Sequence, residues 1–175
     1  MTKRVSSRVA SLAIMFLVTW YPNMGLAVDK ANYSGKYSLQ EKKTPAGSET
    51  EVTLNVVQTD DAIEITKVEQ GRKLTNRYPL NGSEGDYRTP TGVSGKCKAQ
   101  LKDKLLVLES IVVTPTQPNG PSMRMHTKER WQLSKDSKIL TIKTEIDFPD
   151  APPLASSIVG EYGSGTEKYM RTEGP

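Results

Sequence analysis

The feature that most constrains this sequence is a regular alternation of apolar and polar residues, which begins near Tyr33 and recurs almost to the end of the chain. In residues 51–56, for example, Val52, Leu54 and Val56 alternate with polar residues. Successive side chains of a β-strand point to opposite faces of a sheet, so this pattern predicts strands with one buried face. No later segment shows the period of about 3.6 residues that marks an amphipathic helix. The alternation therefore predicts an all-β protein.

About ten such segments follow one another, and turn-forming residues separate them. They span residues 33–40, 51–57, 62–66, 74–80, 86–89, 92–101, 105–113, 123–133, 139–148 and 166–172. Short strands at intervals of roughly ten residues are typical of antiparallel barrels and sandwiches. We expect an up-and-down antiparallel meander that closes into a lipocalin-like barrel of roughly eight to ten strands. A sandwich of two sheets fits the same pattern.

The links between these segments differ in length in a way that bears on function. The second, fourth, sixth and eighth links are tight, as at the turn-forming pair Asn81-Gly82, whereas the first, fifth, seventh and ninth are longer. Successive links of a meander lie at alternate ends of the sheet, so the long loops should gather at one end. A closed bottom and a loop-rimmed mouth form the plan of a barrel that binds a small molecule. The argument requires residues 86–89 to be a strand.

Residues 1–27 have the layout of a secretory signal peptide. Basic residues precede an apolar run over residues 9–20, and Gly25 and Ala27 stand where signal peptidase requires small side chains. An apolar run of about 12 residues is shorter than the roughly 20 that cross a bilayer as a helix. We therefore expect cleavage after Ala27, export to the periplasm or the cell exterior, and no membrane insertion of the processed chain.

The expected signal peptide also accounts for most of the basic charge. The whole chain has 24 Lys and Arg against 20 Asp and Glu, a net charge of +4. Three of the cations and none of the anions lie in the signal, so residues 28–175 have 21 against 20, a net charge of +1. This balance does not favour a nucleic-acid partner. Residues 28–175 are expected to form a single domain, with a long loop rich in Pro, Gly and Ser at 149–165.

The sequence offers few groups for catalysis or metal binding. Residues 92–101, GVSGKCKAQL, lack the glycine spacing of a phosphate-binding loop, and no helix follows them. Cys97 stands on the apolar face of this segment and is expected to be a small buried residue. His126 is the only histidine, and alternation places it on an outward face. One Cys and one His cannot form a zinc site, so we expect no metal, no cofactor and no enzymatic activity.

Polar residues on inward faces mark the candidate binding site. Glu129 shares an inward face with Trp131, and Asn76 shares one with Tyr78. A carboxylate that faces a core must be paired, protonated or directed into a wet cavity. One interpretation is a buried bond from Glu129 to a tyrosine hydroxyl or an arginine, and the other is a polar group in an apolar pocket. On the second interpretation, the ligand-binding residues are Tyr33, Tyr37, Asn76, Tyr78, Glu129 and Trp131.

The tripeptide Gly35-Lys36-Tyr37 in the first expected strand resembles the Gly-x-Trp opening of lipocalin-like (calycin) barrels. The layout, with the hairpin ERWQLSKDSKILTIKT at residues 129–144, is similar to that of small secreted lipocalin-like proteins of uncharacterised function found in bacteria. The likeness covers about residues 33–171. It implies an antiparallel barrel that often holds a hydrophobic small molecule. The link after the first strand is too short for the helical lid of fatty-acid-binding barrels.

These observations lead to two hypotheses about function. The first is an exported, non-catalytic barrel that binds a small apolar or amphipathic molecule at its loop-rimmed end. The second is an interaction or structural module of the cell envelope, in which the core is filled and no ligand is held. The two hypotheses differ in whether a cavity lies between the inward faces.

Overall fold

The computed structural model describes residues 31–43, 51–115, 122–151 and 164–174, and these residues contain strands and turns but no helix. The expected signal peptide, residues 1–27, lies outside these ranges, as does most of the expected 149–165 loop. Within the described part of the chain, no helix is long and apolar enough to cross a membrane.

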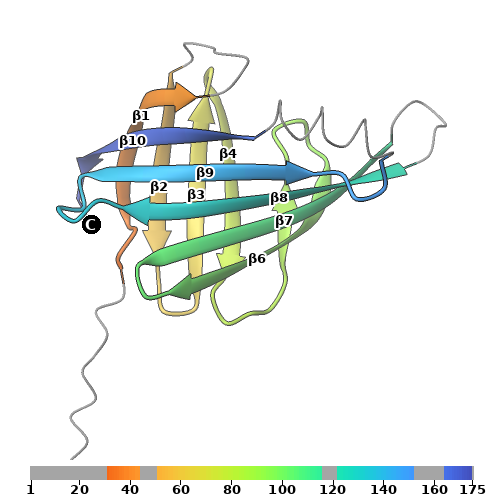
Figure 1. Cartoon of the computed structure of the whole chain (residues 1–175), viewed down its shortest axis with the longest axis horizontal. Coiled ribbons are helices and arrows are strands. Elements are labelled where there is room, and N and C mark those ends of the chain that lie inside the picture. Colours follow the sequence, from red (N-terminus) through yellow and green to blue (C-terminus); the bar gives the residue numbers. More distant parts are fainter. Residues whose placement is uncertain (1–30, 44–50, 116–121, 152–163, 175) are drawn as a thin grey trace, which may run out of the picture.

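In the described part of the chain, ten strands follow one another (Figure 1). They are β1 (Gly35–Lys43), β2 (Val52–Gln58), β3 (Ala62–Glu69), β4 (Arg72–Pro79), β5 (Gly85–Arg88), β6 (Ser94–Lys102), β7 (Leu105–Pro115), β8 (Ser122–Leu133), β9 (Ile139–Asp147) and β10 (Gly165–Glu173). The predicted all-β meander is confirmed, and the short strand expected near residue 86 is present as β5.

All ten strands belong to one antiparallel sheet in the order β4-β3-β2-β1-β10-β9-β8-β7-β6-β5. The first and last strands of the chain therefore pair with each other, with Tyr37 opposite Arg171 and Leu39 opposite Tyr169. The two outer strands of this order, β4 and β5, are consecutive in the chain. The sheet thus curls into a nearly closed barrel, as predicted.

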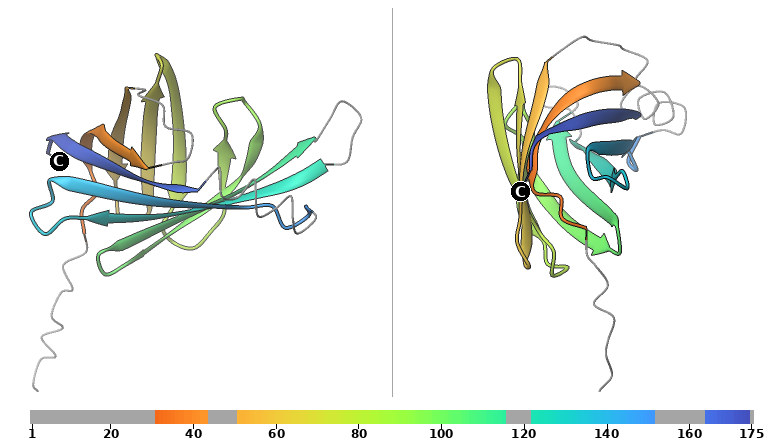
Figure 2. Two further views of the ribbon diagram at one scale, coloured as in Figure 1. Left: turned by 45° about the horizontal axis from the view of Figure 1, so that its top comes forward. Right: turned by 90° about the vertical axis from the view of Figure 1, so that its left-hand side faces the viewer.

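The barrel is flattened, so that two groups of strands face each other. In Figure 1, β2, β3 and β4 cross the direction of β7, β8 and β9 steeply, and Figure 2 shows one group lying over the other. Strand β1 links the two groups, because Gly35–Ser38 pair with β2 while the strand also pairs along β10. Its pairing with β10 shifts register between Lys36 and Tyr37 and between Leu39 and Glu41, and such bulges bend a strand.

The seam between β4 and β5 is closed by side chains. Among the described residues, these strands form no backbone ladder. Instead the Asn76 amide donates to the Arg88 carbonyl at 3.0 Å and accepts from the Arg88 N–H at 2.9 Å. The Cys97 thiol of β6 lies within hydrogen-bonding distance of the carbonyls of Arg77 in β4 and Asp86 in β5. Asn76 and Cys97 together hold the two edges near each other.

The tight-turn end of the barrel is closed by the segment that precedes β1. The Tyr33 hydroxyl lies 2.8 Å from the carbonyl oxygens of both Lys104 and Trp131. The Tyr37 hydroxyl donates to the Tyr33 carbonyl and accepts from Arg171, whose guanidinium also lies over the Tyr37 ring. Both tyrosines are fully buried, so this end of the barrel is filled by aromatic side chains.

A glycine in β6 permits close packing against β7, and its replacement tests the described register. A Cβ at Gly95 would lie 2.2 Å from the Ile111 carbonyl oxygen and 2.6 Å from Val112 Cγ1. We expect Gly95→Ala to reduce the free energy of unfolding by about 2–3 kcal/mol, because the backbone must move. Gly174→Ala is the control, since open space surrounds that position. Urea denaturation measures both, and a Gly95→Ala variant as stable as the control would contradict this register.

Candidate functional site

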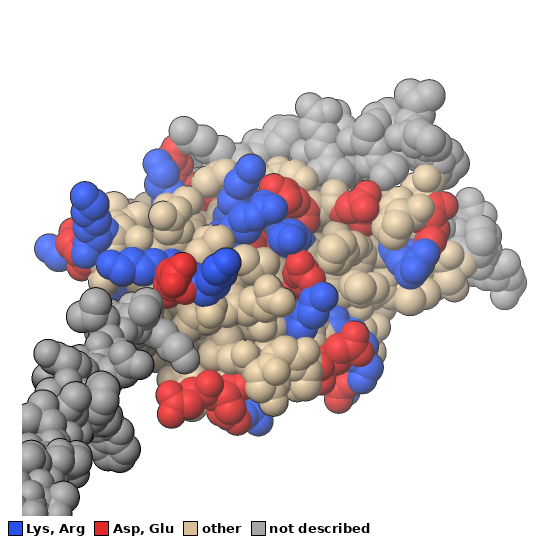
Figure 3. Space-filling model, turned by 60° about the horizontal axis from the view of Figure 1, so that its bottom comes forward, with Lys and Arg blue, Asp and Glu red and all other residues tan. Residues whose placement is uncertain are grey.

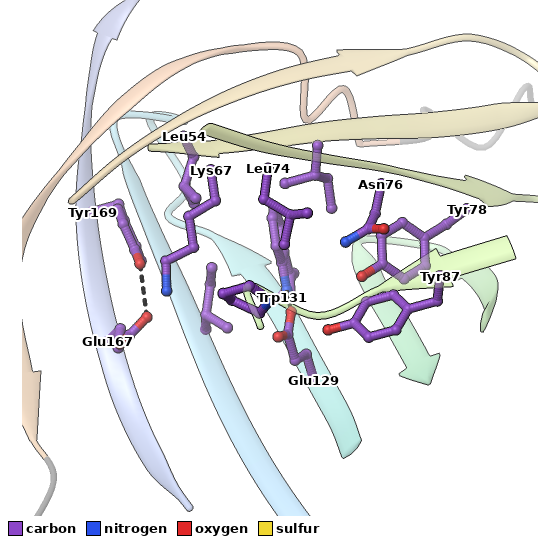
Figure 4. Close-up of a pocket in the computed structure, with 13 residues that line it drawn as sticks. Leu54, Lys67, Leu74, Asn76, Tyr78, Tyr87, Glu129, Trp131, Glu167 and Tyr169 are labelled. Carbon is purple, nitrogen blue, oxygen red and sulfur yellow. Dashed lines mark hydrogen bonds between the residues drawn. The ribbon is translucent and has the colours of Figure 1, made fainter. Parts of the chain in front are cut away.

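A cavity of about 150 Å³ lies inside the barrel (Figure 4). Its lining is contributed by strands from both groups and by Pro90, and consists of Leu54, Ile65, Lys67, Leu74, Asn76, Tyr78, Tyr87, Pro90, Glu129, Trp131, Ile142, Glu167 and Tyr169. A second cavity, also about 150 Å³, shares Lys67, Leu74 and Pro90 with the first and extends to Gln70 at the β3–β4 turn. Together they reach the lower end of the range of roughly 300–1,000 Å³ found for small-molecule sites.

The apolar walls of the first cavity follow from strand alternation. Leu54 in β2 stands opposite Lys67 in β3, which in turn stands opposite Leu74 in β4, so these three side chains form a row across the inner face. Trp131 in β8 and Ile142 in β9 form a corresponding pair on the other group of strands. The apolar residues come from strands far apart in sequence, and the barrel brings them around one space.

Aromatic rings form the side of the cavity next to the β4–β5 seam. The rings of Tyr78 and Tyr87 lie 6.3 Å apart between centroids, and Figure 4 shows them adjacent to each other. Burial and the nearby carboxylate of Glu129 raise the pKa of both hydroxyls. Both tyrosines therefore stay neutral at physiological pH and can donate or accept hydrogen bonds.

Glu129 is the central polar group of the site. Its Oε2 accepts a hydrogen bond from the Trp131 indole N–H at 2.7 Å, two residues along the same strand. The partner is thus a tryptophan, whereas the first of the two interpretations named a tyrosine hydroxyl or an arginine. Burial raises the pKa of the Glu129 carboxyl, and the charge of Glu167 adds to this effect, while the Trp131 bond and Lys67 oppose it. Glu129 is both hydrogen-bonded and directed into the cavity.

Two further charged residues line the cavity and were missed by the sequence analysis. Lys67 forms an ion pair with Glu69, with 3.0 Å between Nζ and Oε2. Glu167 accepts a hydrogen bond from the Tyr169 hydroxyl at 2.7 Å, and Figure 4 shows it directed toward the same space. The signal was available, because Lys67 is in phase with Ile65 and Glu167 with Tyr169. The expected strand, however, ended at residue 66, one residue before Lys67.

The structure separates the six predicted ligand-binding residues into two groups. The first group lines the cavity and comprises Asn76, Tyr78, Glu129 and Trp131. Tyr33 and Tyr37 are absent from this lining and belong to the aromatic closure of the tight-turn end. Contact of any of these residues with a ligand stays a prediction.

Two groups were considered for catalysis, the Cys97 thiol and the His126 imidazole. Cys97 is 3% exposed, and burial raises the pKa of its thiol to about 11, which confirms the expectation of a buried residue. His126 lies on β8, where its backbone pairs with Ile111 and Asp147. In the described ranges, no group of three or more His, Cys, Asp or Glu side chains is arranged to hold a metal ion.

The charged surface is mixed in sign on the face that Figure 3 shows. Lys and Arg side chains alternate with Asp and Glu over this face. Ion pairs among the described residues include Lys96 with Asp86 at 2.7 Å and Lys98 with Glu109 at 2.9 Å. A polyanion such as nucleic acid is bound through a continuous basic area, which the described residues of this face do not form.

Comparison with known proteins gives a fold and no sequence family. No protein-family model matches the sequence, and a search of curated proteins finds no match. Solved structures do match. Fatty-acid-binding protein 1 of Echinococcus granulosus has a TM-score of 0.53 and 8% sequence identity, over 80% of this chain and 97% of that chain.

Two further matches were solved with small molecules. A Schistosoma mansoni fatty-acid-binding protein in complex with arachidonic acid has a TM-score of 0.52 and 16% identity, over 79% of this chain and 95% of that chain. Zebrafish ileal bile acid-binding protein complexed with cholic acid has a TM-score of 0.55 and 13% identity, over 80% and 98%. The chain thus shares its β-barrel fold with the fatty-acid-binding proteins. Residues 44–50, the link judged too short for a helical lid, lie outside the described residues.

Replacing Glu129 tests whether its carboxyl is held in a desolvated site. With a raised pKa, the folded state retains this proton to a higher pH than the unfolded chain, so the stabilisation is complete below the unfolded pKa and is lost as pH rises through the folded pKa. Glu129→Gln removes this titration and keeps an acceptor for Trp131. We expect its stability relative to the native protein to increase from about pH 4 to about pH 8.

Thermal unfolding at both pH values measures this difference, and Glu64→Gln, on the exposed face of β3, is the matched control. A stability difference for Glu129→Gln that is the same at both pH values would contradict the desolvated environment.

Proposed function

We propose that this protein is an exported, non-catalytic barrel that binds a small apolar or amphipathic molecule in the cavity between its two groups of strands. The observation that carries this proposal is a cavity with apolar and aromatic walls and a few polar groups inside a ligand-binding fold. Small-molecule sites commonly combine a mainly apolar lining with a small number of placed polar groups. Leu54, Ile65 and Ile142 would contact the apolar part of the ligand.

The matched structures support the same class of ligand. Arachidonic acid and cholic acid, which are bound by the Schistosoma mansoni and zebrafish proteins, each join a large apolar body to a polar group. The matched proteins are named as fatty-acid-binding and bile acid-binding proteins, which supports a non-catalytic role here. The buried, protonated thiol of Cys97 also agrees with that role, because a nucleophilic cysteine needs a lowered pKa.

The alternative, an envelope module with a filled core, is less well supported. Such a core would pack inward side chains to the density of an organic crystal, with voids no larger than a water molecule. The first cavity has room for several water molecules, at roughly 30 Å³ for each in the liquid. Charged groups also line this cavity, and a core filled only by packed side chains would exclude such groups.

Export rests on the composition of residues 1–27, and processing can be measured directly. We expect the protein recovered from outside the cytoplasm to begin at Val28, because Gly25 and Ala27 fit the small-residue requirement of signal peptidase. N-terminal sequencing or intact mass gives the result. Recovery of the full-length chain in the cytoplasmic fraction would contradict export.

Ligand binding can be followed through a tryptophan that lines the cavity. The chain has two tryptophans, and Trp20 lies in the expected signal peptide, so the protein that begins at Val28 has Trp131 as its only tryptophan. We expect decanol to change Trp131 fluorescence saturably, because an apolar ligand displaces water beside the ring. Leu74 lines both cavities, and Leu74→Phe places a larger side chain there without adding a second tryptophan to the fluorescence signal. This variant should weaken decanol binding by about tenfold, because the ring overlaps the space of the ligand.

Val113→Phe is the matched control, because Val113 lies on β7, is 51% exposed and does not line the cavity. Equal decanol binding by the Leu74→Phe and Val113→Phe variants would show that the ligand does not occupy this cavity.

A further inference from the structure

We infer that the ligand of this barrel carries an uncharged hydrogen-bond acceptor, a hydroxyl or carbonyl oxygen, which the Tyr78 hydroxyl binds inside the cavity. This inference rests on the proposed function and specifies the class of ligand. It differs from the ligands of the matched structures, since arachidonic acid and cholic acid are carboxylic acids. Two features of the cavity support it: a buried tyrosine hydroxyl that has no protein partner, and charged groups that are already engaged or held back from ionising.

The Tyr78 hydroxyl differs from those of the fully buried tyrosines. The hydroxyls of Tyr33, Tyr37 and Tyr169 each form a hydrogen bond with a protein oxygen, at 2.7–2.8 Å. Tyr78 is also buried, with 7% of its surface exposed, yet within the described residues no group forms a hydrogen bond with its hydroxyl. Leaving a buried polar group without a partner costs free energy, so we expect the partner to come from outside the chain.

This hydroxyl lies where a ligand can reach it. Tyr78 lines the cavity, and Figure 4 shows its hydroxyl directed into the space beside Tyr87 and Glu129. In the described part of the chain, no fully enclosed side-chain nitrogen or oxygen lacks a hydrogen-bond partner. The Tyr78 oxygen therefore borders open space in the cavity and is not sealed among packed atoms.

The position of the Tyr78 ring is set by its neighbours. Tyr78 stands on β4 opposite Ile63 of β3, and the Tyr87 ring lies 6.3 Å away between centroids, tilted by 57°. A group that is already held in place loses little conformational freedom when it binds a ligand. The hydroxyl is thus a fixed donor that points into an otherwise largely apolar space.

An anionic head finds no available cation in this cavity. Lys67 is the one cationic side chain of the described lining, and its Nζ already lies 3.0 Å from Oε2 of Glu69. Removing a carboxylate from water without a charged partner costs far more than removing an uncharged group that keeps a hydrogen bond. An acidic ligand would therefore have to compete with Glu69 for Lys67.

A cationic head is not matched either. Burial raises the pKa of the Glu129 carboxyl, and so disfavours the ionised form that would attract a cation. The other carboxyl of the lining, on Glu167, already accepts a hydrogen bond from the Tyr169 hydroxyl. An uncharged head needs neither countercharge, and the Tyr78 hydroxyl can donate to its oxygen.

A series of ligands that differ only in the head group tests the charge. Decanol, decanoate and decylamine bury the same alkyl chain, and at about pH 7 they are neutral, anionic and cationic. The protein that begins at Val28 is titrated with each compound, and Trp131 fluorescence reports binding. We expect decanol to bind about tenfold more tightly than either charged compound, because both charged heads lose more on leaving water.

A pair of variants tests the contact with Tyr78. Tyr78→Phe keeps the ring and removes the hydroxyl, so decanol should bind about tenfold more weakly. The midpoint of thermal unfolding without ligand should not fall, because the protein gives this hydroxyl no partner. Tyr87→Phe is the matched control, since the Tyr87 hydroxyl has Ser110 as a hydrogen-bond partner. It should lower the unfolding midpoint and change decanol affinity by less than about twofold.

The outcomes separate this inference from the proposed function. Decanoate or decylamine binding as tightly as decanol would overturn the uncharged head and leave the proposed function intact. Decanol affinity that is unchanged in Tyr78→Phe, or reduced equally in Tyr87→Phe, would overturn the contact with Tyr78. Failure of all three compounds to bind would overturn both proposals. A preference for decanol that is lost in Tyr78→Phe and kept in Tyr87→Phe is the result that supports the inference.

Discussion

The structure depends on the pairing of its first strand with its last. Because β1 joins β10, the two outer strands of the sheet become β4 and β5, which a short connection keeps near each other. A sheet edge exposes unpaired backbone groups, and here the Asn76 side chain satisfies both backbone groups of Arg88 across the seam. Closure converts the two faces of every strand into an inside and an outside. The inward residues of the strands then surround one space, and the cavity lining is assembled from residues of several strands.

The fold could be predicted from the sequence because alternation is a local property. Each strand carries its own record of which face is buried, and turn pairs such as Asn81-Gly82 mark where strands end. The position of a residue along the barrel axis is not local. Tyr33 and Tyr37 have the same inward character as Tyr78, yet they close the tight-turn end, while Tyr78 lines the cavity. Pairing register alone decides this difference, and register depends on residues distant in sequence.

The charged residues of the cavity could also be predicted only in part from the sequence. Glu129 could be recognised because it interrupts a clearly apolar face beside Trp131, whereas Lys67 stands one residue beyond the expected strand at residues 62–66. Its inward position follows from the extension of β3 to Glu69, opposite Arg72 in β4. The missed residues Lys67 and Glu167 belong to the cavity lining. Sequence patterns therefore indicated a site for a small molecule, and the assembled barrel shows which further side chains line it.

The proposed function requires a ligand that lies between the two groups of strands and contacts residues from both. Nuclear Overhauser contacts between the methylene protons of bound decanol and protein side chains locate the ligand most directly. We predict contacts with the Trp131 indole and with methyl groups of Leu54 and Ile142, which line the cavity from β2 and β9. Contacts confined to the exposed side chains Val113 and Met170 would place the ligand on the outer surface and contradict the account.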